Sequence, residues 1–340
     1  MALTSRLQIM ATRGGLYETH DFRGESADGR YAFILKHVTF RPLWRGNGLV
    51  EVALMCFDRV SGSRQCVVER ESMTELHHRQ LKKIADWEHF TFSFGSGSFV
   101  EVSRNRLRGK LHSAEAAAAW DMRLQRPDQS AGNFGYELPW PRHGIRVSDG
   151  GMAAEGRLAA GKLALTGSFA LTNTHYWGNG YPHEFAAGQC SHFDGESGAG
   201  FYGFNTRLSL GRLKSPYLGM ACLKLRGRRY AFDSLAGSFR HRLESLDNYR
   251  WRVTFLNPEY GLEVLVDGQN PRITPWMAWH ADHPSGGRSV VKVTPFAQAE
   301  LVLFRRRNQE RVAVLKTGSM ELKTLLPENV PEFSGFAAEA

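Results

Sequence analysis

The feature that most constrains this fold is a two-residue alternation of apolar and polar side chains that recurs along the chain. Residues 90–94 alternate phenylalanine with Thr and Ser, and residues 251–255 alternate Trp, Val and Phe with polar residues. Successive side chains of a strand point to opposite faces, so this period is typical of half-buried β-strands. Turn-forming pairs such as Asp28-Gly29 and Asp267-Gly268 separate the segments, as expected for antiparallel neighbours.

Convincing amphipathic helices are scarce. The best candidate runs from Ser72 to Trp87, and a second is the alanine run from Ala116 to Ala119, which leads into a strand-like segment at Trp120. Strands and helices do not alternate regularly, which disfavours parallel α/β folds. The sequence therefore predicts an all-β, mostly antiparallel protein.

The length of 340 residues allows one large domain or two modest ones with substantial cores. A loop-like stretch runs from Arg126 to Asn133, and an irregular polar and aromatic passage begins at Thr172. We expect two β domains, residues 1–170 and 171–340, with the boundary near residue 170.

The chain is basic, with 43 Lys and Arg against 34 Asp and Glu, a formal charge of +9. Such a charge attracts acidic partners without naming one. The basic residues are scattered apart from Lys82-Lys83, 226–229 and 305–307, and no nucleic-acid-binding motif is present. We therefore expect no nucleic-acid partner, and at most peripheral contact with an anionic membrane.

Four cysteines, Cys56, Cys66, Cys190 and Cys222, have no CxxC spacing, which favours reduced thiols over a disulfide framework or a metal knuckle. No run approaches the roughly 20 apolar residues of a spanning helix, and the first residues lack the apolar stretch of a signal peptide. We expect a cytoplasmic protein. The sequence does not indicate its oligomeric state.

The chain contains no HExxH, P-loop, GxSxG or strand-following GxGxxG motif. Its most informative segment is 173–195, which gathers three His, one Trp, two Tyr, one Glu and one Asp. One interpretation is a cavity lined by aromatic side chains that binds an apolar ligand and carries an acid. The other is that these side chains simply fill the junction of two sheets.

Two further hypotheses are weaker. His175, His183 and His192 could bind zinc together with Glu184 or Asp194, but spacings of eight and nine residues match no compact ligand motif. Cys190, two residues before His192, lacks an identifiable third group that would make it a nucleophile. The sequence therefore predicts no metal site and no cofactor.

Segments 173–178 and 189–195 resemble the central motif of the tocopherol cyclase-like family, which pairs an aromatic-Trp-Gly element with a Gln-Cys-x-x-Phe strand. Residues 118–124, 138–141 and 314–321 give looser support. The wider clan includes carotenoid 1,2-hydratases and has two tandem lipocalin-like β-barrels. The resemblance thus implies that architecture here, over residues from about 30 to 325, with β-barrels or sandwiches as its two domains.

Hydratases of this clan show His-x-Trp followed by Tyr-x-Asp, whose Asp resembles a proton donor to an isoprenoid double bond. Here His175-x-Trp177 and Tyr202 match, whereas Phe204 occupies the Asp position. The resemblance therefore implies His175 and Tyr202 as catalytic candidates, and we expect Asp194 or Glu184 to supply the proton instead.

We expect a hydrophobic ligand of isoprenoid or polyketide type to bind between the two barrels, without a cofactor, and to undergo cyclisation, hydration or isomerisation by acid catalysis. The alternative is a non-catalytic carrier. Along an extended strand, Cys190, His192 and Asp194 should share one face. The expected ligand-contacting residues are Trp177, Tyr176, Tyr181, His192, Trp120, Trp140 and Phe204.

Overall fold

The computed structural model describes most of the chain in separate stretches. These are residues 15–42, 48–72, 90–114, 116–125, 133–138, 143–148, 152–178, 182–210, 213–269, 274–282 and 288–325. Contacts between Cα atoms divide the chain into two compact units, Met1–Gly180 with Asp282–Gly287 and Tyr181–Ala281 with Arg288–Ala340. The described residues contain no helix long and apolar enough to cross a membrane.

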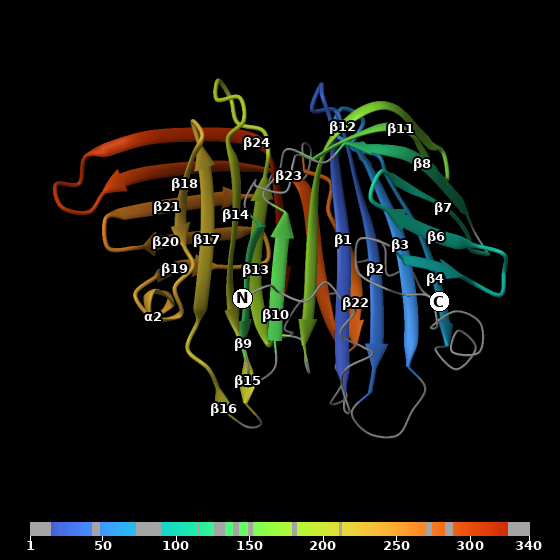
Figure 1. The fold of residues 1–340 in the computed structure, drawn as a ribbon, viewed down its shortest axis with the longest axis horizontal. Helices are drawn as coiled ribbons and strands as arrows, with labels where there is room; N and C mark the ends of the chain where they lie inside the picture. Colours follow the sequence, from blue (N-terminus) through green and yellow to red (C-terminus); the bar gives the residue numbers. More distant parts are fainter. Residues whose placement is uncertain are drawn as a thin grey trace. The chain divides into compact units, whose positions relative to one another are not determined.

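The first unit is built on one curled antiparallel sheet (Figure 1). Its described strands follow the order β4-β3-β2-β1-β12-β11-β8-β7-β6-β5, and β10 pairs with β12 and β9. The strands are β1 (Leu16–Ser26), β2 (Tyr31–Arg41), β3 (Leu49–Asp58), β4 (Arg64–Ser72), β5 (Phe90–Ser93), β6 (Phe99–Ser103), β7 (Arg106–His112), β8 (Ala117–Gln125), β9 (Asn133–Leu138), β10 (His143–Ser148), β11 (Met152–Ala160) and β12 (Leu163–Gly178).

The inner face of this sheet forms the core of the first unit. Strands β2 and β3 contribute Phe33, Leu35, Val52 and Leu54, each at most 2% exposed, to a cluster that extends through β8 and β12. The N-terminal strand β1 pairs with β2 on one side and with β12 on the other, about 150 residues away in sequence. The pairing of β1 with β12 therefore places the first and the last strand of this unit side by side in the sheet.

The second unit has one large antiparallel sheet and a separate two-stranded sheet, with a single short helix among its described residues. The strand order is β18-β17-β14-β13-β24-β23-β21-β20-β19, β22 pairs with β23, and β15 pairs with β16. The elements are β13 (Glu184–Cys190), β14 (Gly200–Arg207), β15 (Ser209–Leu210), β16 (Leu213–Lys214), β17 (Leu218–Leu225), β18 (Arg228–Phe232), α2 (Leu235–Ser238), β19 (Arg242–Leu246), β20 (Arg250–Leu256), β21 (Tyr260–Asp267), β22 (Met277–Asp282), β23 (Arg288–Arg305) and β24 (Arg311–Leu325).

The alternation seen in the sequence corresponds to the core of the second unit. Trp251, Val253 and Phe255 of β20 are buried, as are the apolar residues of β21 that face the same side. Trp251 also donates a hydrogen bond from its indole nitrogen to the Asn205 side-chain oxygen at 2.9 Å. The expected all-β, antiparallel fold is confirmed.

Three local expectations have different outcomes. The helix expected at Ala116 to Ala119 is wrong, because Ala117 to Ala119 begin β8, whose backbone pairs with both β7 and β11. The helix expected from Ser72 to Trp87 lies outside the described residues after Ser72. The domain boundary expected near residue 170 falls within β12, and the two compact units divide between residues 180 and 181.

Candidate functional site

A group of polar side chains occupies core-facing positions on three neighbouring strands of the first unit. His20 of β1 lies directly opposite His37 of β2 and His175 of β12, while Glu18 lies opposite Trp177. These five residues, called the Glu18 cluster below, are between 0% and 4% exposed. They share the inner face with apolar residues, so the register of β1 with β2 and β12 brings the cluster together.

The cluster is organised around the carboxylate of Glu18. His175 Nε2 lies 2.8 Å from Glu18 Oε1, and His20 Nε2 lies 3.6 Å from the same oxygen. The two imidazole rings are stacked, with centroids 4.0 Å apart and planes 14° from parallel. The indole of Trp177 lies 4.6 Å from the His175 ring, measured between centroids, with the planes tilted by 36°.

The charges in the cluster follow from opposing effects. Burial alone would raise the pKa of Glu18, but the hydrogen bond from His175 and the nearby imidazole of His20 more than offset this effect, and the pKa is well below its usual range. Glu18 is therefore ionised, and a carboxylate only accepts hydrogen bonds. His175 Nε2 must accordingly carry the proton in the 2.8 Å hydrogen bond.

Burial, together with the nearby His20, lowers the pKa of His37 to about 3, so His37 is neutral.

Glu18, His20 and His175 are also residue types that bind metal ions. One ligand atom from each lies within 4.8 Å of the other two. Ligands of one zinc ion lie about 2.0–2.2 Å from the metal, which places neighbouring ligand atoms about 3.3 Å apart. The shorter contact between His175 and Glu18 is that of a charge-assisted hydrogen bond. The geometry is therefore that of a hydrogen-bonded cluster.

The opposite face of the same strands also carries buried charges, but these are paired. Lys36 Nζ lies 3.6 Å from Asp21 Oδ1, and Arg23 lies 3.1 Å from Glu25. Each pair combines one positive and one negative group. They do not reach the inner face, because alternate residues of a strand point to opposite sides.

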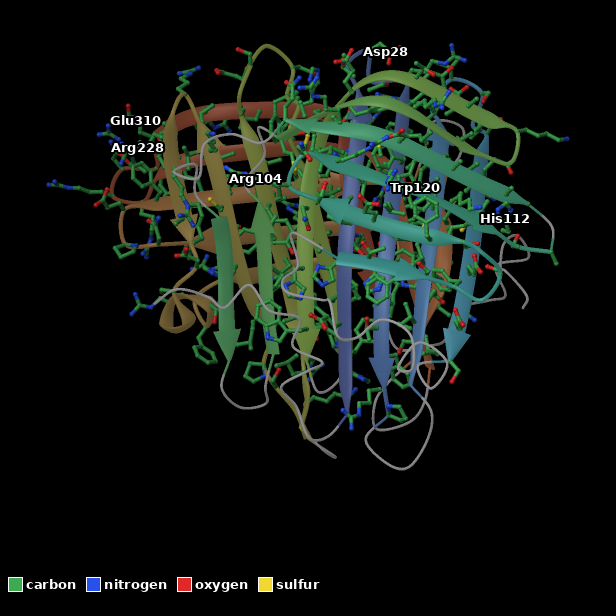
Figure 2. All side chains as sticks on the ribbon, turned by 45° about the vertical axis from the view of Figure 1, so that its right-hand side comes forward. Asp28, Arg104, His112, Trp120, Arg228 and Glu310 are labelled. Atoms are coloured by element: carbon green, nitrogen blue, oxygen red, sulfur yellow. The ribbon has the colours of Figure 1, made fainter. Side chains whose placement is uncertain are left out.

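Four residues expected in the ligand site belong to the first unit. His175 and Trp177 lie together in the Glu18 cluster. Tyr176 points to the other face, with its ring 6.4 Å from that of Tyr17. Trp120 (Figure 2) is buried in the apolar core of this unit. Trp140 and Tyr181 lie outside the described residues.

Glu184 belongs to the second unit, where it opens β13. Its carboxylate accepts a hydrogen bond from the Tyr217 hydroxyl, and Arg207 lies 3.6 Å away. Burial and this contact with Glu184 raise the pKa of Tyr217 to about 12. The carboxylate is thus held by its own neighbours in the second unit.

The remaining expected site residues are divided between a strand and a turn of the second unit. Tyr202 and Phe204 are buried on β14, 6.2 Å apart between ring centroids. Strand β13 ends at Cys190, whose thiol donates to the backbone oxygen of His192. His192 and Asp194 are exposed in the following turn. The expectation that Cys190, His192 and Asp194 share one strand face is therefore wrong.

The three-histidine metal hypothesis is also wrong. His175 lies in the first unit, while His183 and His192 flank β13 in the second. An extended strand rises about 3.3 Å per residue, so the nine residues from His183 to His192 place them far beyond a shared ion. Their grouping in sequence reflects only the passage of the chain from one unit to the next.

The sequence interpretation missed Glu18, His20 and His37. The sequence did contain a pattern that points to them. Glu18, His20 and Phe22 are alternate residues of one strand, so their side chains lie on the same face. Likewise, His37 follows Phe33 and Leu35 at the same period. Titratable residues at core-facing positions of an alternating pattern are candidates for a buried site.

No protein-family model and no curated protein sequence matches this chain. Solved structures do resemble it. An AttH-like protein from Nitrosomonas europaea has a TM-score of 0.52 and 10% identity over 93% of this chain and 95% of its own. CghA, solved with Sch210972, has a TM-score of 0.50 and 9% identity, covering 92% and 89%. Kievitone hydratase from Nectria haematococca has a TM-score of 0.48 and 7% identity, covering 95% and 90%.

The first of these similarities extends over nearly the whole of both chains. At about 10% identity it is a similarity of fold. Together with the two curled antiparallel sheets, it defines the class of this protein as an all-β chain of two tandem lipocalin-like barrels.

Proposed function

We propose that this protein binds a hydrophobic ligand of isoprenoid or polyketide type in the first unit and converts it by proton transfer from the Glu18 cluster. The reaction is a cyclisation, hydration or isomerisation. The observation that carries the proposal is the buried hydrogen bond between Glu18 and His175, at a core-facing position where apolar side chains are the norm.

The geometry gives Glu18 and His175 distinct roles. Glu18 holds the Nε2–H of His175 and stabilises a positive charge on that imidazole, as a carboxylate does in a catalytic dyad. The ring can then donate a proton to a ligand double bond or accept one from a ligand hydroxyl. His175 is the proton carrier, and Glu18 is a positioning residue.

Trp177 supports the same reaction in two ways. Its π-face, beside His175, can stabilise a cation formed when an alkene is protonated. Its buried indole N–H, like that of Trp120, has no acceptor among the described residues. A buried donor without an acceptor is costly, so an oxygen atom of a ligand would satisfy it. An oxygenated apolar ligand meets both requirements.

The resemblance to tocopherol cyclase-like proteins, through residues 173–195, favours an isoprenoid as the ligand. The structural similarity to CghA, which was solved with Sch210972, is consistent with ligand binding by this fold. The proposal differs from the sequence expectation in two respects. The ligand binds in the first unit rather than between the two barrels, and the Glu18 cluster takes the role expected of Asp194 or Glu184.

The test measures proton transfer to carbon. Apolar compounds extracted from the purified protein are identified by mass spectrometry and incubated with fresh protein in D₂O, so that protonation of an alkene introduces deuterium. We expect wild type to incorporate deuterium and His175→Gln to lose about 100-fold or more of the rate. Gln can still donate to Glu18 but cannot transfer a proton.

Asp194→Asn is the matched control, because Asp194 is exposed in the second unit, and its rate should equal that of wild type. Glu18→Gln should reduce the rate less than His175→Gln, since it removes only orientation and charge stabilisation. A bound apolar compound that acquires no deuterium would show a carrier rather than an enzyme. The absence of any bound apolar compound would exclude both functions.

A further inference from the structure

A surface cavity of about 290 Å³ lies on the second unit, and no residue of the Glu18 cluster lines it. Its walls come from β18, the segment leading into α2, and the end of β20 with the turn that follows it. Arg228, Tyr230, Asp233, Asn257 and Tyr260 are among the lining residues. The lining combines guanidinium groups, aromatic rings and backbone polar groups, a mixture suited to a ligand that is part charged and part apolar.

Arg228 is fixed at this cavity by two tyrosines. Its guanidinium carbon lies 4.9 Å from the centre of the Tyr230 ring and 5.1 Å from that of Tyr260. The two rings contact each other edge to face, with centroids 5.1 Å apart. No carboxylate pairs with Arg228 in the described part of the chain. Cation–π contacts with both rings hold the charge in place without neutralising it.

The walls of the cavity are held together by Asn257. Its side-chain nitrogen donates to the Ala231 carbonyl at 3.0 Å, and its side-chain oxygen accepts from the backbone N–H of Tyr260 at 2.7 Å. Arg306 in turn donates to the Asn257 carbonyl at 2.8 Å and, from its backbone, to the Glu259 carbonyl at 2.9 Å. Binding to a wall ordered in this way costs little conformational entropy.

These contacts unite two basic stretches that are far apart in sequence, 226–229 and 305–307. Three of their arginines are paired with carboxylates, in the pairs Arg226 with Glu196, Arg229 with Asp233 and Arg305 with Glu310. Among the described residues Arg228, Arg306 and Arg307 have no carboxylate partner, and of the carboxylates lining the cavity only Glu259 has no arginine. The lining itself balances Arg228 and Arg229 against Asp233 and Glu259, so the excess of positive charge in this region comes from the stretch 305–307. In Figure 2, Arg228 and Glu310 both lie at the margin of the second unit.

We propose that this cavity binds a phosphate ester group, with Arg228 as the principal contact and the rings of Tyr230 and Tyr260 packed against the organic part of the ligand. A guanidinium group presents paired N–H donors that match two phosphate oxygens. The phosphate belongs either to a soluble ester or to a lipid headgroup, and the two sources share this chemistry. The site is independent of the Glu18 cluster, which lies in the other unit.

The experiment uses the full-length protein. Binding of phenyl phosphate is measured by titration calorimetry, and binding to phosphatidylcholine vesicles with and without phosphatidic acid by sedimentation. We expect wild type to bind phenyl phosphate and Arg228→Gln to bind it at least tenfold more weakly. Arg228→Lys, which keeps the charge but loses the planar fork, should lie between them.

Arg252→Gln is the matched control, because it removes the charge of another exposed arginine of the same unit, and it should bind like wild type. His175→Gln should also bind like wild type, which separates this site from the proposed reaction. Arg228-dependent binding to phosphatidic acid vesicles identifies a lipid headgroup, and binding of phenyl phosphate alone identifies a soluble ester. Absence of both, or equal binding by wild type and both Arg228 variants, overturns the proposal.

Discussion

Glu18 is the residue at which burial and hydrogen bonding oppose each other most directly. A carboxylate at 0% exposure loses the solvation that water provides, which by itself favours the protonated acid. The hydrogen bond to His175 and the contact with His20 reverse this preference. The two imidazole neighbours thus explain why a buried carboxyl group is ionised in the barrel interior. Removing either neighbour should raise the pKa of Glu18.

His37 gives a prediction for stability against pH. The unfolded chain binds a proton on this imidazole below about pH 6.5, whereas the folded chain binds one only below about pH 3. Between these values the unfolded state holds the extra proton, so the free energy of unfolding decreases as the pH falls. The slope for one group is at most about 1.4 kcal/mol per pH unit.

The groups that act on His37 are Glu18, His20 and Asp21 of β1 and Lys36 of its own strand. The lowered pKa of Glu18 also makes the free energy of unfolding decrease at lower pH. The ionised carboxylate stabilises the folded state above the pKa of about 4.3 that Glu has in the unfolded chain, and this stabilisation is lost as the pH falls below that value. Denaturant titrations at pH 7, 6 and 5 should therefore show a flatter slope for His37→Gln than for wild type. The exposed His112→Gln is the control, and equal slopes for the two variants would contradict the prediction.

At the scale of strands, the pairing of β10 with β12 positions Trp177. Gly144 lies directly opposite Trp177 in this pair, and a Cβ added at Gly144 would overlap the indole ring. We expect Gly144→Ala to displace the ring from His175 and to lower the free energy of unfolding by about 1–3 kcal/mol. The tryptophan fluorescence and the rate of deuterium incorporation should both change.

Gly109→Ala is the matched control for this substitution. A Cβ at Gly109 would overlap Trp120 and also the backbone oxygen of Phe99, but Trp120 lies in the apolar core outside the Glu18 cluster. The control should therefore lose at least as much stability while keeping the deuterium incorporation rate in the folded protein. If both variants lose that rate equally, the effect comes from general loosening of the first unit.

Strand pairing also marks the limit of what the sequence could predict. His175 and Trp177 lie two residues apart on one strand, so alternation alone places them on one face. Glu18 and His20 come from a strand about 150 residues earlier, and register between such strands is set by packing that no local pattern reveals.

The turn after Cys190 is a second feature that the sequence pattern did not predict. A sulfur contact with the backbone of His192 and a positive φ of 73° at Gly195 end the extended conformation.

At the scale of the whole molecule, the two-residue alternation of apolar and polar side chains was sufficient to predict the fold class. The alternating segments became strands of two sheets, and the alanine run before Trp120 became strand because its neighbours β7 and β11 pair with it, which overrides the high helix propensity of alanine. The division of site residues could not be foreseen. Segment 173–195 spans the passage between the two units, so residues that are close in sequence belong to two different cores.

Because each unit has its own hydrophobic core, we expect a destabilising substitution in one unit to affect the unfolding of that unit alone. The cluster containing Leu54 draws its residues from the first unit and the cluster containing Leu262 from the second, and both leucines are 0% exposed. Replacing either by Ala creates a cavity that costs about 2–5 kcal/mol. We expect calorimetry to resolve two unfolding transitions, with Leu54→Ala lowering the temperature of one and Leu262→Ala lowering that of the other. The exposed Val60→Ala should leave both unchanged, and a single transition lowered equally by the two leucine variants would show that the cores unfold as one.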